Sequence, residues 1–167
     1  RGSGVGVAVG IYSVEFGTLL GGTPAGRSVY AATGASLSIA SGRLSFALGL
    51  HGPCASVDTA CSASLVALHA AVRALRAEEC ASHLAAGVNL MLLPSTSLCF
   101  AIAGMTSARG RCHTFDSRAD GFARGEGAAV AVFSLRGASM RLLGIAVRQD
   151  GRSASLTAPN GAAQQML

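Results

Sequence analysis

Short apolar runs alternate with segments of helical apolar periodicity along this chain. Residues 4–10 carry valines among small residues, which predicts a buried strand. Between Thr33 and Leu50 apolar and small residues recur at helical spacing, and Gly49 with the Gly52-Pro53 pair follows them. This pattern predicts a helix over Thr33 to Leu50.

The next segment has the order strand, tight turn, cysteine, helix. Residues 55–58 predict a short strand, and Thr59-Ala60 leads directly into Cys61. A helix is predicted from about Ser62 to Glu79, with apolar residues around most of its circumference. We therefore expect this helix to be buried along its first half.

The remaining apolar segments predict three further strands and one short helix. Residues 84–92 predict a strand, and residues 98–105 predict a short helix after a loop at Pro94. Residues 128–135 and 142–147 predict two strands of an antiparallel hairpin. This hairpin predicts a mixed sheet, and helices that alternate with buried strands predict a three-layer α/β fold.

Composition favours a soluble domain that contributes to a larger body. The 167 residues fit one domain, and only 13% of them are charged, against roughly 25% in an ordinary soluble domain. No apolar run approaches the eighteen or so residues of a membrane span. Five cysteines without a C-x-x-C pair argue against a zinc knuckle and a complete disulfide framework, so we expect a reducing compartment, the cytoplasm. Because the chain opens on Arg1 and not on Met, organelle targeting stays open.

The distribution of charge along the chain indicates which kind of binding partner is favoured. All thirteen basic residues are arginines, the net charge is +5, and the arginines are scattered. A basic balance favours an acidic partner, but no basic run or aromatic stacking set supports a nucleic acid. A small acidic protein is the favoured partner.

Cys61 is the candidate for chemistry. A cysteine attacks as its thiolate, which the positive end of a helix dipole stabilises. Backbone N–H groups at the same turn could hold a developing oxyanion, as in the nucleophile elbow of acyl-transfer enzymes. The alternative is that Cys61 is a small buried hydrophobic residue, the commoner fate of a free cysteine.

Four segments carry a family resemblance. The sequence V-D-T-A-C-S-A-S-L-V-A-L-H around Cys61 resembles the D-T-A-C-S-S-S-L-V-A-L-H active-site segment of β-ketoacyl synthases, above all polyketide synthase ketosynthases, and departs from it at Ala63. Three more segments follow the family in order: Y-A-A-T-G-A-S-L-S-I-A-S-G-R-L-S-F, G-R-C-H-T-F-D-S-R-A-D-G-F-A-R-G-E-G and Q-D-G-R-S-A-S-L-T-A-P-N-G. They cover nearly the whole chain.

The resemblance implies a thiolase-like fold in which two α/β halves pack into an αβαβα arrangement, usually as a homodimer. Residues 1–167 would be the N-terminal part of a ketosynthase domain that contains the nucleophile, without the C-terminal half. Cys61 would take an acyl group from the phosphopantetheine arm of an acyl carrier protein, and a malonyl-type thioester would then condense with it by decarboxylation. No cofactor or metal would bind the chain directly.

The family's two catalytic histidines lie in E-A-H-G-T-G-T and K-x-N-x-G-H motifs, which this sequence does not contain. We expect them beyond Leu167. The four histidines present, His51, His69, His83 and His113, are expected to be structural or solvated. Without the two motifs we expect the isolated chain to be inactive.

Two further assignments and two alternative functions stay open. Asp58 either orients a base or, as we favour, caps backbone N–H groups, and the charges at Asp116, Asp120, Arg124 and Glu126 predict a solvated or internally paired loop. One alternative is a non-catalytic ketosynthase-like subunit that scaffolds or dimerises. The other is a different thiol acyltransferase or hydrolase of the same shape.

Overall fold

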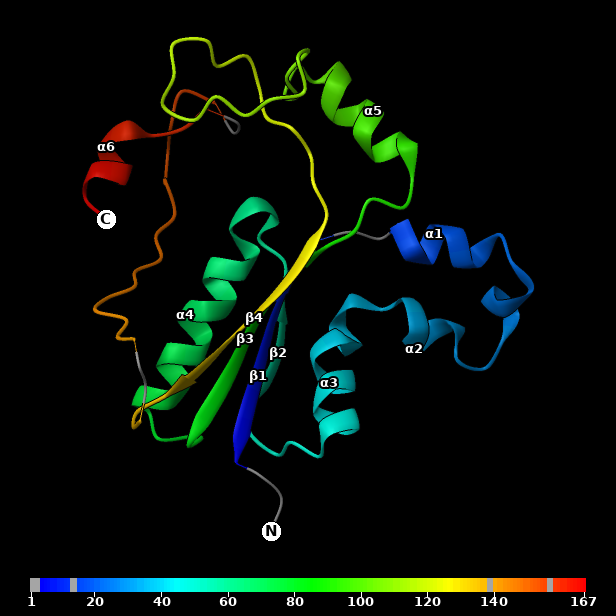
Figure 1. The fold of residues 1–167 in the computed structure, drawn as a ribbon, viewed down its shortest axis with the longest axis vertical. Helices are drawn as coiled ribbons and strands as arrows, with labels where there is room; N and C mark the ends of the chain where they lie inside the picture. The colour runs from blue at the N-terminus through cyan, green and yellow to red at the C-terminus, as the bar shows by residue number, and fades with distance from the viewer. Residues whose placement is uncertain (1–3, 13–14, 138–139, 156–157) are drawn as a thin grey trace.

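In the computed structural model, four strands form one sheet in the order β2-β1-β3-β4 (Figure 1). β1 (Val5–Ile11) pairs in parallel with β2 (Cys54–Val57) and with β3 (Ser82–Asn89), whereas β4 (Gly127–Ser134) pairs antiparallel with β3. The predicted mixed sheet is confirmed. The structure describes residues 4–12, 15–137, 140–155 and 158–167.

Helices cover both faces of the sheet. α3 (Ala40–Leu48) lies on one face and α4 (Ala63–Arg76) on the other, as the edge-on view of Figure 1 shows. The other helices are α1 (Glu15–Gly21), α2 (Ala31–Ala35), α5 (Pro94–Ile102) and α6 (Gly161–Gln165).

The single helix predicted over Thr33 to Leu50 is wrong, because the chain breaks at Ser36. Ser36 has an extended ψ of 123°, so α2 ends there and a 3-10 turn, Leu37–Ile39, leads into α3. Its hydroxyl also lies 2.6 Å from that of Ser38, a local hydrogen bond that competes with helical geometry. The predicted stop is confirmed, since Gly49 caps α3 with a left-handed φ of 63°.

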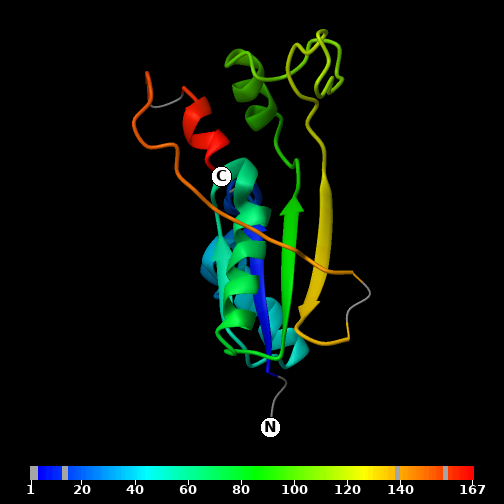
Figure 2. The same cartoon turned by 90° about the vertical axis from the view of Figure 1, so that its left-hand side faces the viewer.

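The predicted hairpin between residues 128–135 and 142–147 is also wrong. β4 forms as expected, but its partner is β3, and residues 142–147 are not in a strand. Figures 1 and 2 show that this later segment runs past α4, on the helix side of the sheet. Its backbone therefore lies away from the edge of β4, where a strand would need to be.

Two different packing surfaces make the core. On the α3 side, Val7 and Val9 of β1 pack with Ala86 of β3 and with Leu50, which follows α3. On the α4 side the contact is made by small residues, and the helix buries four alanines. They are Ala63, Ala67, Ala71 and Ala74. Small side chains on both surfaces let α4 approach the sheet closely.

One face of α4 remains open. Leu65 is 62% exposed, so the prediction that the first half of this helix is buried all round is wrong for this chain. Val132 of β4 and Phe46 of α3 are exposed to 70% and 91%. Apolar side chains exposed to this extent indicate surfaces that another part of a protein covers. Within the described ranges, no helix has the length and apolar character that crossing a membrane requires.

Candidate active site

Cys61 follows a strained turn between β2 and α4. Asp58, directly after β2, accepts a hydrogen bond at Oδ1 from the N–H of Ala60 over 2.9 Å. Ala60 has a left-handed φ of 52°, which is costly for a residue with a Cβ. Ser62 donates from its hydroxyl to the carbonyl of Thr59 over 2.9 Å and closes the turn. The capping role favoured for Asp58 is the one that the structure shows.

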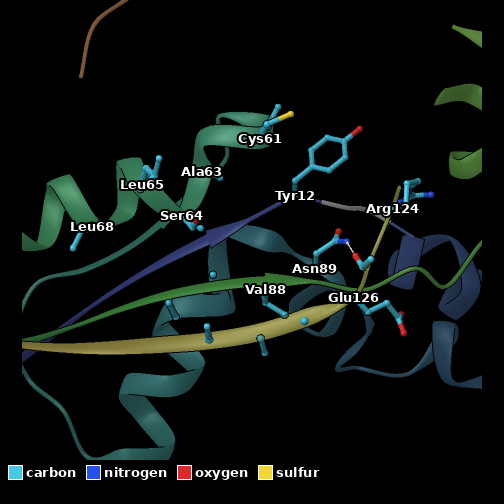
Figure 3. A pocket seen from close by; sticks show the side chains of 18 of the residues that line it. Tyr12, Cys61, Ala63, Ser64, Leu65, Leu68, Val88, Asn89, Arg124 and Glu126 are labelled. Carbon is cyan, nitrogen blue, oxygen red and sulfur yellow. Dashed lines mark hydrogen bonds between the residues drawn. The ribbon is translucent and has the colours of Figure 1, made fainter. Parts of the chain in front are cut away.

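The sulfur of Cys61 is exposed at the N-terminal end of α4. Cys61 lies in a 3-10 turn, Ala60–Ser62, that runs directly into the fourteen-residue helix. Figure 3 shows its side chain beside the cavity, on the side of Tyr12. The predicted order of strand, turn, cysteine and helix is confirmed, and the alternative of a buried cysteine is not what the structure shows. This is the placement that exposes a sulfur to the positive end of a helix dipole.

Two glycines of the sheet determine where α4 begins. A Cβ added at Gly10 of β1 would lie 2.5 Å from the carbonyl carbon of Ala63 and from Cα of Ser64. A Cβ added at Gly87 of β3 would lie 2.8 Å from Cβ of Ser64. No side chain fits at either position without movement. The first turn of α4, which begins two residues after Cys61, therefore packs directly against the backbone of these two glycines.

A cavity of about 950 Å³ opens in front of Cys61. Its floor consists of small residues of β3 and β4, and Leu65 and Leu68 of α4 overhang it. Larger side chains also line it: Tyr12, Phe100, Met105, Phe122 and Arg124. An apolar cavity beside an exposed sulfur can hold an acyl chain next to a nucleophile.

Glu15 is a buried carboxylate that sequence reasoning missed. Its side chain is 4% exposed, and its Oε2 accepts hydrogen bonds from the N–H groups of Leu92 and Leu93, the latter over 2.7 Å. Leu93 is the N-cap of α5, so the carboxylate satisfies N–H groups where that helix begins. A hydrogen bond from the Thr96 side chain, followed by the one from Leu93, lowers the pKa of Glu15 against the opposing effect of burial. Glu15 is the only charged residue between Arg1 and Arg27, which was the available signal.

Arg124 connects Glu15 to aromatic residues that line the cavity. Its guanidinium donates from Nη1 to the hydroxyl of Ser97 over 2.6 Å, and its Nη2 lies 3.8 Å from Oε1 of Glu15. The same group lies over the ring of Phe100, 5.2 Å from the ring centre, and Phe100 meets Phe122 edge to face at 6.0 Å. We call Phe100 and Phe122 the aromatic wall.

Asp116 and Asp120 are paired within the charge-rich loop, as predicted, whereas the prediction is wrong for Arg124, which is largely buried and pairs with Glu15 outside the loop. Arg118 binds Asp116 over 2.6 Å, and Arg109 binds Asp120 over 3.1 Å. Hydrogen bonds from the side chain and the backbone N–H of Arg118 lower the pKa of Asp116, and a hydrogen bond from Ser107 is the main cause that lowers the pKa of Asp120. The pairs are partly exposed, so they contribute little beyond local order. Glu126 instead accepts the N–H of Met91 over 2.6 Å.

None of the four histidines, all of which the structure describes, lines the Cys61 cavity. His83 is 3% exposed on β3, and its Nδ1 lies 3.0 Å from the carbonyl oxygen of Leu84. Burial lowers its pKa. His69 is half-buried, and its Nδ1 has no hydrogen-bond partner among the described residues. His51 is exposed and His113 is half-buried, so the geometry gives no local base to Cys61.

An exposed cysteine on a strained turn between a strand and a helix, beside an apolar cavity, is an arrangement that acyl-transfer enzymes with a nucleophilic thiol use. Comparison with known proteins narrows this class. Residues 1–136 match the family described as "Beta-ketoacyl synthase, N-terminal domain". The chain therefore belongs to the β-ketoacyl synthase family, whose members are condensing enzymes of the acyltransferase type.

Relatives in polyketide biosynthesis support the same conclusion. The chain is 48% identical over 175 residues to a phenolphthiocerol synthesis polyketide synthase type I of Mycobacterium bovis, covering all of the chain and 8% of the relative. It is 44% identical over 175 residues to erythronolide synthase EryA3 of Saccharopolyspora erythraea, covering all of the chain and 6% of the relative. The chain thus spans less than a tenth of the length of these curated relatives.

A solved structure confirms the fold. The ketosynthase from module 6 of the bacillaene synthase of Bacillus subtilis 168 superposes with a TM-score of 0.82 at 35% identity, covering all of this chain and 30% of that one. The predicted thiolase-like α/β fold is confirmed, and the sheet described above fits the N-terminal half of that fold. The family prediction, a ketosynthase domain of the polyketide synthase kind, is likewise confirmed.

Proposed function

We propose that this chain is the nucleophile-bearing part of a ketosynthase domain and that Cys61 is its nucleophile. The observation that carries the proposal is the exposed Cys61 sulfur, on a left-handed turn at the start of α4 and at the mouth of the cavity. A backbone held in such a costly conformation next to a reactive group is typical of a functional site. The family match supports the same residue, because it includes this segment.

In the proposed first step, the Cys61 thiolate attacks the carbonyl carbon of an acyl thioester on the phosphopantetheine arm of an acyl carrier protein. A new C–S bond forms, the carbonyl π electrons move to oxygen, and backbone N–H groups of the turn stabilise this oxyanion. The intermediate collapses as the pantetheine C–S bond breaks. The pantetheine thiolate leaves and takes up a proton, and Cys61 is acylated.

In the second step, a malonyl-type thioester loses CO₂ and its enolate attacks the acyl-Cys61 carbonyl. A C–C bond forms, the Cys61 thioester bond breaks, and the thiolate is regenerated as a β-ketoacyl thioester leaves on the carrier. The enolate needs stabilising donors, and no histidine lines the cavity in the described chain. We infer that these donors come from a second α/β half beyond residues 1–167.

The same second half accounts for the open surface of α4. Leu65 overhangs the cavity and is largely exposed, as expected if another body packs against this face. We expect the complete domain to be a homodimer in the cytoplasm, with an acidic carrier protein as its partner. The net charge of +5 supports that partner.

The test uses the complete ketosynthase, with all residues that follow Leu167 in the gene. Purified protein is incubated with an acyl carrier protein or with acyl-CoA, and covalent acylation is measured by intact mass and peptide mapping. We expect one acyl group on Cys61, none in Cys61→Ala, and normal labelling in Cys54→Ala, which removes another exposed cysteine. Equal labelling of wild type and Cys61→Ala would refute the proposal.

A second assay separates the alternatives. With malonyl-carrier added, a condensing enzyme forms a β-ketoacyl product, whereas a hydrolase releases free acid without needing malonyl-carrier. Acylation without condensation, in a gene whose downstream histidine motifs are replaced, would favour the non-catalytic alternative.

A further inference from the structure

A buried ion pair between Glu15 and Arg124 contacts the aromatic wall of the Cys61 cavity. Glu15 and Arg124 are 4% and 12% exposed, whereas the other two ion pairs of the described chain lie in a partly exposed loop. Burial of two charges needs a compensating role, because each ion loses its water. Here each partner also makes hydrogen bonds at the start of α5.

Glu15 determines where α5 begins. Its carboxylate accepts two backbone N–H groups at the start of the helix and a hydrogen bond from Thr96 in its first turn. These contacts join α1 to residues 77 and 78 positions away in the sequence. A carboxylate at this end also interacts favourably with the helix dipole.

Arg124 contacts neighbouring residues of the same helix. It donates to Ser97 in the first turns of α5, and its planar guanidinium covers the ring of Phe100 one turn later. Arg124 itself lines the Cys61 cavity, together with Phe100 and Phe122. One part of the cavity lining therefore consists of two aromatic rings in contact with a guanidinium that pairs with Glu15.

We propose that Glu15 and Arg124 are positioning residues that hold the aromatic wall in place and thereby set the length and width of acyl group that Cys61 accepts. The inference rests on the proposed role of Cys61 in acyl transfer. Neither residue touches the reacting atoms. Their effect is transmitted through α5 to Phe100, and from Phe100 to Phe122.

The test measures acyl selectivity and not activity alone. Complete ketosynthase is acylated with N-acetylcysteamine thioesters from acetyl to octanoyl, and kcat/KM is measured for each. Because discrimination of one methylene by an apolar pocket is worth about tenfold or more, Glu15→Gln and Arg124→Met should change the octanoyl-to-acetyl ratio by about fivefold or more. In Glu15→Gln the acetyl rate should stay within about threefold of wild type, because Glu15 does not line the cavity.

Matched variants separate positioning from general destabilisation. Arg118→Met makes the same change in an exposed pair of the same loop and should leave the ratio unchanged. Arg124→Lys keeps a charge for Glu15 but loses the planar stack on Phe100, so its ratio should fall between wild type and Arg124→Met. The double variant of Glu15→Gln with Arg124→Met should change the ratio by less than the product of the two single changes, because the two residues share one ion pair.

A second measurement keeps the inference independent of thioester chemistry. N-alkyl iodoacetamides of increasing chain length alkylate an exposed cysteine without catalysis, and their rates at Cys61 report the space in front of the wall. We expect the same change in chain-length preference in this series. If Cys61 of the wild type is alkylated but is never acylated by a thioester, the proposed function is wrong. The alkylation series still tests whether Glu15 and Arg124 hold the aromatic wall in place. An equal rate loss for every chain length, or an unchanged ratio in both series, would overturn the positioning role.

Discussion

The close contact between Gly10 of β1 and the first turn of α4 gives the most specific prediction. Replacement of Gly10 by Ala places a Cβ 2.5 Å from two backbone atoms of the first turn of α4, where ordinary carbon contacts lie at about 3.5–4.0 Å. The helix must therefore move by roughly 1 Å to relieve the overlap. Backbone atoms cannot rotate away as a side chain can, so the start of α4 has to move.

The expected cost follows from this displacement. Overpacking of this kind lowers the free energy of unfolding by about 1–3 kcal/mol. Because Cys61 directly precedes the displaced turn, its sulfur moves with the helix. A misplacement of about 1 Å at a reacting atom can lower a rate about a hundredfold. We expect Gly10→Ala to reduce acylation of Cys61 by that order, while alkylation by a small reagent such as iodoacetamide falls far less.

A graded series serves as the control. Gly87→Ala brings its Cβ to 2.8 Å from Cβ of Ser64, a smaller overlap than the 2.5 Å contacts at Gly10, so it should be milder than Gly10→Ala. Gly42→Ala lies inside α3 with no atom within 4 Å of the added Cβ, and it should raise stability by about 0.5–1 kcal/mol through helix propensity. Melting temperature and kcat/KM for acylation are measured for all three in the complete ketosynthase. A wild-type acylation rate in Gly10→Ala, or a larger loss of acylation rate in Gly87→Ala, would contradict the inference that the contact at Gly10 positions α4 and Cys61.

Three further predictions concern the turn and the sheet. Asp58→Ala removes the acceptor that holds the N–H of Ala60 and should lower the melting temperature by about 2–4 °C, whereas Asp58→Asn keeps an acceptor oxygen and should not. Ala60→Gly relieves a left-handed φ of 52°, so urea unfolding should show stability unchanged or raised by up to about 1 kcal/mol; a loss would contradict the strain. His83 is buried with a lowered pKa, so the folded state binds fewer protons than the unfolded state. Stability should therefore be full above about pH 6.5 and decrease as the pH falls below that value, and this part of the slope should be missing in His83→Gln.

Sequence reasoning succeeded where the determinants are local. The order of strand, turn, Cys61 and helix was predicted because apolar runs, a short carboxylate at Asp58 and helical spacing lie within a few residues of one another. The stop at Gly49 was predicted for the same reason, since a left-handed cap needs little beyond the residue itself. The mixed sheet was predicted from a hairpin that does not form, and the sheet is mixed because β4 pairs antiparallel with β3.

The predictions that failed depend on distant partners. Residues 142–147 have the composition of a strand, but a strand forms only where a neighbouring backbone is available, and this segment passes on the α4 side of the sheet. Glu15 could be noticed as an isolated charge, yet its role depends on Leu92, Leu93 and Arg124, which are far away in the sequence. No periodicity within a short window contains that information.

The structure places the nucleophile and the aromatic wall on separate supports, and this separation can be tested directly. Cys61 depends on Gly10 and Gly87 beneath α4, whereas Phe100 depends on Glu15 and Arg124 beside α5. Sites that share no partner usually contribute additively. Gly10→Ala should therefore lower kcat/KM for acetyl and octanoyl donors by the same factor, while Glu15→Gln changes their ratio. The double variant should show both effects multiplied, and a departure from this product by more than about threefold would mean that α4 and α5 respond as one unit.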